Sequence, residues 1–216
     1  MGNNCCGPRD RAEQKQDAQE SVTLPDYTKV LSEVRGVEQD LTILVLGLDN
    51  AGKTSILRSF SRESLGSIKP TTGFQIKTQK YDSTTLNLKE VGGSAAIRPY
   101  WTHYIDNAQG LIWVVDSSDR KRINDSKSEL HKLLTSPKLA DCPLLVLANK
   151  SDAGGMSVAE MSAFLALNKI KGRQWAIEGC SAISGKGIPV GVDYITYIGY
   201  IKDKVPVPPG ANPFRD

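Results

Sequence analysis

The sequence has few histidines and little net charge, and it has no long apolar run. Its two histidines, His103 and His131, are too few and too scattered for a histidine-rich metal site. We expect no transmembrane helix, because no apolar stretch approaches the roughly 18 residues needed, and no secretory signal peptide. A net charge of +3 is too small to indicate nucleic-acid binding. With 39% hydrophobic and 24% charged residues, the 216-residue chain has the composition of one globular domain with tails.

Cysteine is also scarce, and its placement argues against disulfides. Cys142 and Cys180 lie in or beside apolar runs and are predicted to be buried thiols. Cys5 and Cys6 are adjacent at a polar terminus, which is a poor place for a structural disulfide. The pattern favours a reducing compartment.

The two ends of the chain differ from its middle, so we divide it into three parts. Residues 1–40 form an N-terminal extension, polar at first, in which apolar spacing over 26–38 predicts a short amphipathic helix. We interpret that helix as packing on the domain. Membrane contact is the alternative, but 1–40 carries five basic against eight acidic residues, the wrong sign for anionic lipid. Residues 41–204 form the globular domain, and 205–216, with four prolines, form a non-helical tail.

Strands and helices alternate through the domain. We predict strands at 41–47, 74–80, 84–91, 111–116, 144–148 and 175–181, and helices at 52–60, 120–135, 157–167 and 190–204. Runs such as LIWVVD and LLVLA are continuously apolar, as expected of strands that are buried on both faces. The predicted fold is therefore α/β, a doubly wound and mostly parallel six-stranded sheet with helices on both faces.

A phosphate-binding loop follows the first predicted strand. Residues 47–54, GLDNAGKT, fit the pattern G-x-x-x-x-G-K-[ST] and lead directly into a predicted helix. Glycines let backbone N–H groups face a phosphate, and the helix N-terminus adds its dipole. Lys53 is predicted to reach the β- and γ-phosphates, and the Thr54 hydroxyl to bind Mg²⁺. The predicted phosphate-binding residues are Gly47, Asp49, Asn50, Ala51, Gly52, Lys53, Thr54 and Ser55.

A second motif selects the base. Asn149-Lys150-Ser151-Asp152 begins at the carboxyl end of the LLVLA strand. The Asp152 carboxylate can accept two hydrogens from guanine that adenine does not offer, which argues against a general P-loop ATPase or kinase. Asn149 is expected to tie this loop to the P-loop and the Lys150 stem to cover the base. A backbone N–H of Ser181-Ala182 can donate to guanine O6.

These motifs together resemble the Arf-like GTPases of the Ras superfamily over about residues 41–203. The resemblance rests on GLDNAGKTSILRSF, on PTTGF at 70–74, and on GG followed by IRPYW at 92–101. It implies a monomeric small G-protein domain that uses GTP, GDP and Mg²⁺, with Thr71 as a second metal ligand and Gly93 sensing the γ-phosphate. Effectors, exchange factors and GTPase-activating proteins are then expected at the switch regions, 62–74 and 92–104. Within the Arf-like family, IRPYW and GLDNAGKT favour a resemblance to the branch that releases lipidated cargo in cilia.

Switch II departs from the family pattern at three positions. The family reads Trp-Asp-Val-Gly-Gly-Gln, whereas residues 89–94 read Lys-Glu-Val-Gly-Gly-Ser. Glu90 stands where an aspartate holds Mg²⁺ through water; its longer side chain must fold back, so we expect weaker metal binding. Ser94 stands where glutamine orients the attacking water and is too short to reach that point, so we predict very slow GTP hydrolysis. The alternative is a partner that supplies both the water orientation and an arginine.

The third departure, Lys89, alters the surface where effectors dock. It replaces the tryptophan that completes an aromatic triad with Phe74 and Tyr104, so it removes apolar contact area and adds a charge. Two readings remain open: a different, acidic partner, or a solvated strand-edge lysine. Because all three changes fall in the switch machinery, a scaffold protein locked in one nucleotide state is the alternative to a working switch.

The first residues fit a lipid anchor. MGNNCC resembles M-G-x-x-x-[ST], which predicts myristoylation of Gly2. One myristoyl chain anchors only marginally, and palmitoylation of Cys5 and Cys6 is the second signal that we expect. An unmodified tail is the alternative. Acylation predicts localisation in the cytoplasm and at the cytoplasmic face of membranes, the cilium included.

Overall fold

The computed structural model describes residues 39–81 and 84–202. Several predictions concern other parts of the chain: the helix at 26–38, the acylation sites Gly2, Cys5 and Cys6, and the tail at 205–216. They lie outside the described residues.

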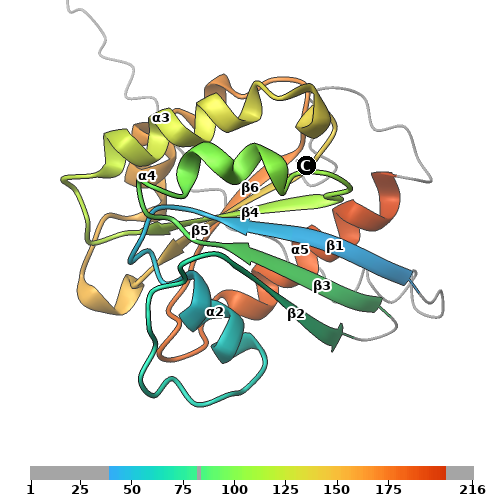
Figure 1. Cartoon of the computed structure of the whole chain (residues 1–216). Coiled ribbons are helices and arrows are strands. Elements are labelled where there is room, and N and C mark those ends of the chain that lie inside the picture. Colours follow the sequence, from blue (N-terminus) through green and yellow to red (C-terminus); the bar gives the residue numbers. More distant parts are fainter. Residues whose placement is uncertain (1–38, 82–83, 203–216) are drawn as a thin grey trace, which may run out of the picture.

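Six strands form one twisted sheet in the order β2-β3-β1-β4-β5-β6 (Figure 1). The strands are β1 (Gln39–Leu46), β2 (Phe74–Tyr81), β3 (Thr84–Val91), β4 (Gly110–Asp116), β5 (Leu144–Asn149) and β6 (Trp175–Gly179). All neighbouring pairs are parallel except β2 and β3, which are antiparallel. This edge pair follows from the chain itself, because a two-residue connection between strands permits only an antiparallel hairpin. The predicted fold class, mostly parallel and six-stranded, is confirmed.

Helices cover both faces of the sheet (Figure 1). The α-helices are α2 (Lys53–Phe60), α3 (Ile123–Leu134), α4 (Val158–Phe164) and α5 (Ile188–Lys202). Short 3₁₀ helices are η1 (Arg98–His103), η2 (Pro137–Leu139), η3 (Ser151–Ala153) and η4 (Leu167–Lys169). Among the described residues, no helix has the length and apolar character needed to cross a membrane.

Each face of the sheet has its own apolar core. One core joins the sheet to α3 and α4 through buried residues such as Leu130, Leu133 and Met161. The other joins it to α2 and α5 through residues such as Ile56 and Ile195. The central strands β4 and β5 are buried along their whole length, as their apolar runs predicted. Cys142 and Cys180 are buried, also as predicted.

Several predicted boundaries are wrong by one to three residues, among them the start of β1, which lies at Gln39 instead of 41. Helix α3 begins at Ile123 instead of 120, because the Asp119 carboxylate accepts the backbone N–H of Arg122 (3.2 Å) and holds a turn there. Helix α4 ends at Phe164, short of 167, because Ala166 turns left-handed at φ 52°. Strand β6 ends at Gly179, where the backbone turns into the following loop. Helix α5 starts at Ile188, two residues early, since a proline is tolerated in the first helical turn.

Candidate nucleotide-binding site

The P-loop wraps around the ammonium group of Lys53. Residues 47–54 connect β1 to α2, and Lys53 Nζ donates to the carbonyl oxygens of Gly47 (3.0 Å) and Leu48 (2.9 Å). Gly52 holds the turn into α2 at φ 91°, and a Cβ there would lie 2.2 Å from Asn149 Nδ2. Burial lowers the pKa of Lys53 to about 8. A phosphate close to Nζ would favour the charged form of this lysine.

Both switch segments meet the P-loop around one cleft of about 420 Å³. Its lining residues come from the P-loop and α2, from the loop before β2, and from the end of β3 with the residues after it. They are Asp49, Asn50, Gly52, Lys53, Thr54, Ser55, Ile68, Lys69, Pro70, Thr71, Glu90, Gly92, Gly93 and Ser94. Most of the predicted phosphate, metal and catalytic residues therefore line a single cavity.

Hydroxyl and carboxylate oxygens converge at one corner of this cleft. Thr54 Oγ1 donates to Glu90 Oε1 (2.6 Å), Thr71 Oγ1 donates to the same oxygen (3.1 Å), and the two hydroxyls are 3.3 Å apart. Within the described ranges, no three His, Cys, Asp or Glu side chains gather into a metal-binding cluster. The donor set of two hydroxyls and one carboxylate, all oxygen, suits a hard cation such as Mg²⁺ that also binds phosphates.

The base-recognition motifs meet through Asn149. This buried side chain donates from Nδ2 to the Ala51 carbonyl (2.9 Å) and accepts the Ala182 N–H at Oδ1 (3.1 Å). It thus links the P-loop, the β5 end and the loop after β6, and the tie to the P-loop is the contact that the sequence predicted. The backbone N–H groups of Ser181 and Ala182, which we expected to donate to guanine O6, donate here to the Lys186 carbonyl (3.0 Å) and to Asn149. Asp152 lies on η3 and is exposed to solvent, where a base can reach it. Ser181 is buried in the loop after β6.

Lys150 makes an ion pair that the sequence did not reveal. Its Nζ lies 2.7 Å from Asp116 Oδ2, and its backbone is left-handed at φ 63°. Burial acts to raise the pKa of Asp116, but hydrogen bonds from Lys150 and Ser118 outweigh it and hold the pKa below its usual value. The ion pair holds the lysine side chain at the carboxyl ends of β4 and β5, where it can cover a base.

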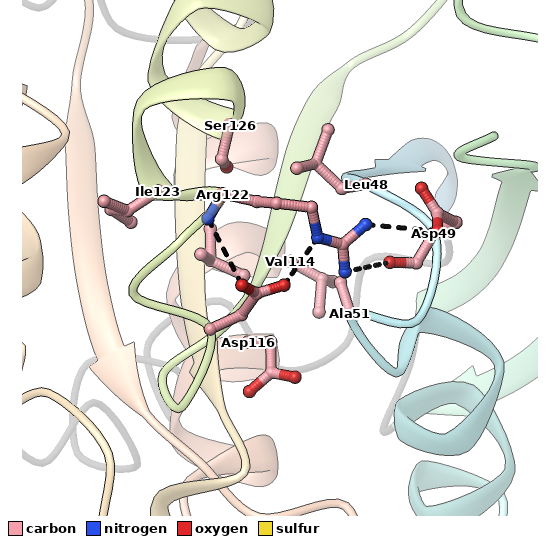
Figure 2. Close-up of a pocket in the computed structure, with 10 residues that line it drawn as sticks. Leu48, Asp49, Ala51, Val114, Asp116, Arg122, Ile123 and Ser126 are labelled. Atoms are coloured by element: carbon pink, nitrogen blue, oxygen red, sulfur yellow. Dashed lines mark hydrogen bonds and ion pairs between the residues drawn. The ribbon is translucent and has the colours of Figure 1, made fainter. Parts of the chain in front are cut away.

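A second unpredicted feature is a charged clasp on the P-loop, formed by Asp49, Arg98 and Arg122. Asp49 Oδ1 accepts from Arg98 (3.2 Å), and Asp49 Oδ2 accepts from Arg122 (3.1 Å). Figure 2 shows the Arg122 guanidinium pointing at Asp49. Arg122 also donates from Nε to Asp119 Oδ2 (2.6 Å). Arg98 also donates to the Gly93 carbonyl (2.9 Å). Burial raises the pKa of Asp49, but its arginine partners bring the pKa below the ordinary value. The clasp joins the P-loop to switch II and to the start of α3.

Comparison with known proteins identifies the family. The model of the ADP-ribosylation factor family matches residues 27–198. The chain belongs to this family. Its sequence is 44% identical over 167 residues to ADP-ribosylation factor-like protein 2 of Dictyostelium discoideum, covering 77% of this chain and 91% of the relative. It is 44% identical over 170 residues to ADP-ribosylation factor-like protein 3 of Chlamydomonas reinhardtii, covering 77% and 96%.

A solved structure of the family has the same fold. The Arl6 BBS3 small GTPase from Trypanosoma brucei, with bound nucleotide analogue GppNp, superposes with a TM-score of 0.70 at 28% identity. The match covers 76% of this chain and 99% of that one. The chain is therefore an Arf-like small GTPase, and GTP and GDP binding is the property of its family.

The three departures in switch II lie in different settings. Glu90 is buried at the corner of the cleft where the Thr54 and Thr71 hydroxyls converge, with 1% of its surface exposed. Ser94 is partly buried at the edge of the cleft, where its carbonyl accepts the backbone N–H groups of Ile97 and Arg98. Lys89 lies opposite Ile76 in the β2–β3 register, on the face that also carries Phe74. The ring of Phe74 packs on Tyr104 at 5.2 Å between centroids, so two of the three triad positions are in contact.

Proposed function

We propose that this Arf-like GTPase is a molecular switch that recruits effectors in its GTP state and hydrolyses GTP slowly. The observation that carries the proposal is the shared cleft: Thr71 from switch I and Gly93 from switch II both line the cavity beside Lys53. A γ-phosphate and its Mg²⁺ in this cavity would hold both segments in one arrangement, and its loss would release them. Mg²⁺ is assigned to Thr54, Thr71 and Glu90.

Slow hydrolysis is proposed from Ser94. Its side chain is too short to orient the attacking water as a glutamine does, and the nearby Arg98 guanidinium is engaged by Asp49 and the Gly93 carbonyl. We expect Ser94→Gln to raise single-turnover GTP hydrolysis by about 10-fold or more, because positioning dominates this reaction. Ser184→Gln, in the loop after β6, is the matched control, and an unchanged rate in Ser94→Gln would refute the assignment.

A scaffold locked in one nucleotide state is the second candidate, favoured by the clustering of departures at positions 89, 90 and 94. The two candidates differ in what the purified protein holds. We expect GDP and nucleotide exchange that a partner accelerates for a switch, measured by chromatography of released nucleotide and by release of a fluorescent analogue. Stoichiometric GTP that persists for hours would establish the locked scaffold instead.

The effector surface is proposed to include Lys89 together with exposed apolar side chains. Phe74 and Ile76 are 53% and 56% exposed, and Tyr100 on η1 is 55% exposed. A partner with apolar side chains and a carboxylate would complement this surface better than effectors that dock on the tryptophan found in the family at the position of Lys89. We expect Lys89→Glu to weaken GTP-dependent capture of partners, whereas Lys121→Glu on the exposed surface before α3 leaves it unchanged.

Membrane attachment is proposed through myristoylation of Gly2 and palmitoylation of Cys5 or Cys6. The support is the sequence MGNNCC, in which two thiols can supply the second anchor that a single myristoyl chain needs. We propose the cytoplasm and the cytoplasmic face of membranes, including the ciliary membrane, as the site of action. Cell fractionation of Gly2→Ala tests this, because equal membrane binding in the variant would exclude the anchor.

A further inference from the structure

A buried carboxylate oxygen lies where the two predicted magnesium hydroxyls meet. Glu90 Oε1 is 2.6 Å from Thr54 Oγ1 and 3.1 Å from Thr71 Oγ1, and the third distance, between the hydroxyls, is 3.3 Å. The three oxygens form a closed triangle with one corner each from α2, switch I and β3. Glu90 lines the cleft and is 1% exposed, so its carboxylate is shielded from bulk water.

The triangle has the size of one face of a magnesium octahedron. Mg²⁺ holds its ligands at 2.0–2.1 Å in near-ideal octahedral geometry, which places adjacent oxygens about 2.9 Å apart. The three observed distances bracket that length. All three oxygens can therefore bind one cation from the same side, with the opposite side left for phosphate oxygens.

The other carboxylate oxygen is held by a neighbouring strand. Glu90 Oε2 accepts from Gln75 Nε2 (2.6 Å), and Gln75 is its direct partner in the antiparallel register of β2 and β3. This hydrogen bond fixes the plane of the carboxylate and points Oε1 at the hydroxyls. Gln75 is thus a positioning residue for the metal corner.

We propose that Glu90 binds the divalent cation directly and takes the place of the water through which an aspartate acts in the family. The extra methylene of glutamate, compared with aspartate, supplies the reach. With GTP bound, the ligand set becomes Thr54, Thr71, Glu90, one oxygen from each of the β- and γ-phosphates, and a single water. This inference rests on the proposed nucleotide switch. It reverses the expectation from the sequence that the longer side chain weakens metal binding.

Counting the metal-bound waters tests the proposal directly. The protein is loaded with GppNp and Mn²⁺, and retention of nucleotide is verified with a fluorescent analogue. Line broadening of the Mn²⁺ electron paramagnetic resonance signal in ¹⁷O-enriched water then counts the coordinated waters. We expect one water in the wild type, an additional water in Glu90→Asp, and the wild-type count in Glu160→Asp, a matched change on the surface of α4.

Affinity supplies a second readout. We expect Glu90→Asp to bind Mn²⁺ at least about 10-fold more weakly than the wild type. The measure is the Mn²⁺ concentration at which the rate of nucleotide release falls to half. Gln75→Leu is expected to give a smaller loss, because it frees the carboxylate plane without removing the ligand. Two waters in the wild type would overturn direct coordination, and this count decides even if Glu90→Asp fails to fold. Loss of nucleotide binding by the wild type would instead overturn the proposed function, and the inference with it.

Discussion

Gly93 shows how a single missing side chain sets the position of switch II. A Cβ at Gly93 would lie 2.3 Å from the Gly47 carbonyl oxygen and 2.5 Å from the Asp49 nitrogen. Its own carbonyl accepts the Asp49 N–H at 3.1 Å. Only glycine lets switch II approach the P-loop this closely.

We therefore expect Gly93→Ala to weaken GTP binding. Forcing a methyl group into this contact costs about 1–3 kcal/mol, which corresponds to roughly 5- to 150-fold in affinity. GDP binding should change less, because it does not need the Gly93 N–H. Gly73→Ala is the control, since a Cβ there would meet no atom within 4 Å. Titration of a fluorescent GTP analogue measures both, and equal affinities for Gly93→Ala and wild type would contradict the argument.

Cys180 gives a prediction about pH. Burial raises the pKa of this thiol to about 12, so its thiolate remains scarce throughout the range from pH 7 to pH 9. We expect alkylation of Cys180 by iodoacetamide to stay slow across that range in the native protein and to become fast in urea. Mass spectrometry of the labelled peptides follows the reaction. Alkylation in the absence of urea that is as fast as in urea, or that levels off near pH 9, would show instead that the thiol is open to solvent and has an ordinary pKa.

At the scale of elements, the Asp49 clasp connects parts of the chain that the sheet alone does not join. Arg122 donates to Asp119 (2.6 Å) at the start of α3 and to Asp49 (3.1 Å) in the P-loop. A network of this kind stabilises the fold more than an isolated surface ion pair does, because two carboxylates fix the guanidinium at once. It sets α3 against the nucleotide site.

Arg122→Ala should therefore lower the free energy of unfolding by about 1–2 kcal/mol. Arg120→Ala is the matched control. It removes the ion pair between Arg120 and Glu160 (3.2 Å), whose side chains are 58% and 47% exposed, and it should leave the free energy of unfolding almost unchanged. Urea denaturation at low and high salt measures both variants. Equal losses would mean that the clasp adds nothing beyond an ordinary surface pair.

At the scale of the whole molecule, the nucleotide site draws on widely separated parts of the sheet. The P-loop follows β1, and Glu90 lies near the end of β3. The guanine-recognition motif begins at the end of β5, where Asn149 also bonds to the loop after β6. The carboxyl ends of these parallel strands share one edge of the sheet, which is where ligands bind in open α/β folds (Figure 1). A bound nucleotide should consequently stabilise the entire domain.

We expect GTP and GDP, but not ATP, to raise the melting temperature at equal concentration. A ligand at 1,000 times its Kd adds about 4 kcal/mol to the free energy of unfolding. Asp152→Asn should abolish the selective shift, because it removes the carboxylate that accepts from guanine, whereas Ser151→Ala should keep it. Differential scanning fluorimetry measures the shifts. An equal shift with ATP would contradict the assignment of Asp152.

Much of this protein could be read from its sequence because the information is local. The apolar runs of β4 and β5 determined buried strands, and the P-loop pattern determined a strand–turn–helix with Lys53 and Thr54 in the first turn of the helix. Boundaries were less accurate, since capping contacts such as that of Asp119 and the left-handed turn at Ala166 depend on backbone detail.

Only the tertiary structure decided which distant side chains meet. The convergence of Glu90, Thr54 and Thr71 on one point requires three elements to be packed together, and no spacing within the sequence encodes it. The same holds for the Asp49 clasp, whose partners lie 49 and 73 residues away. Sequence periodicity reports which face of a strand or helix is buried, whereas interatomic distances between elements are set by the packing of two cores against one sheet.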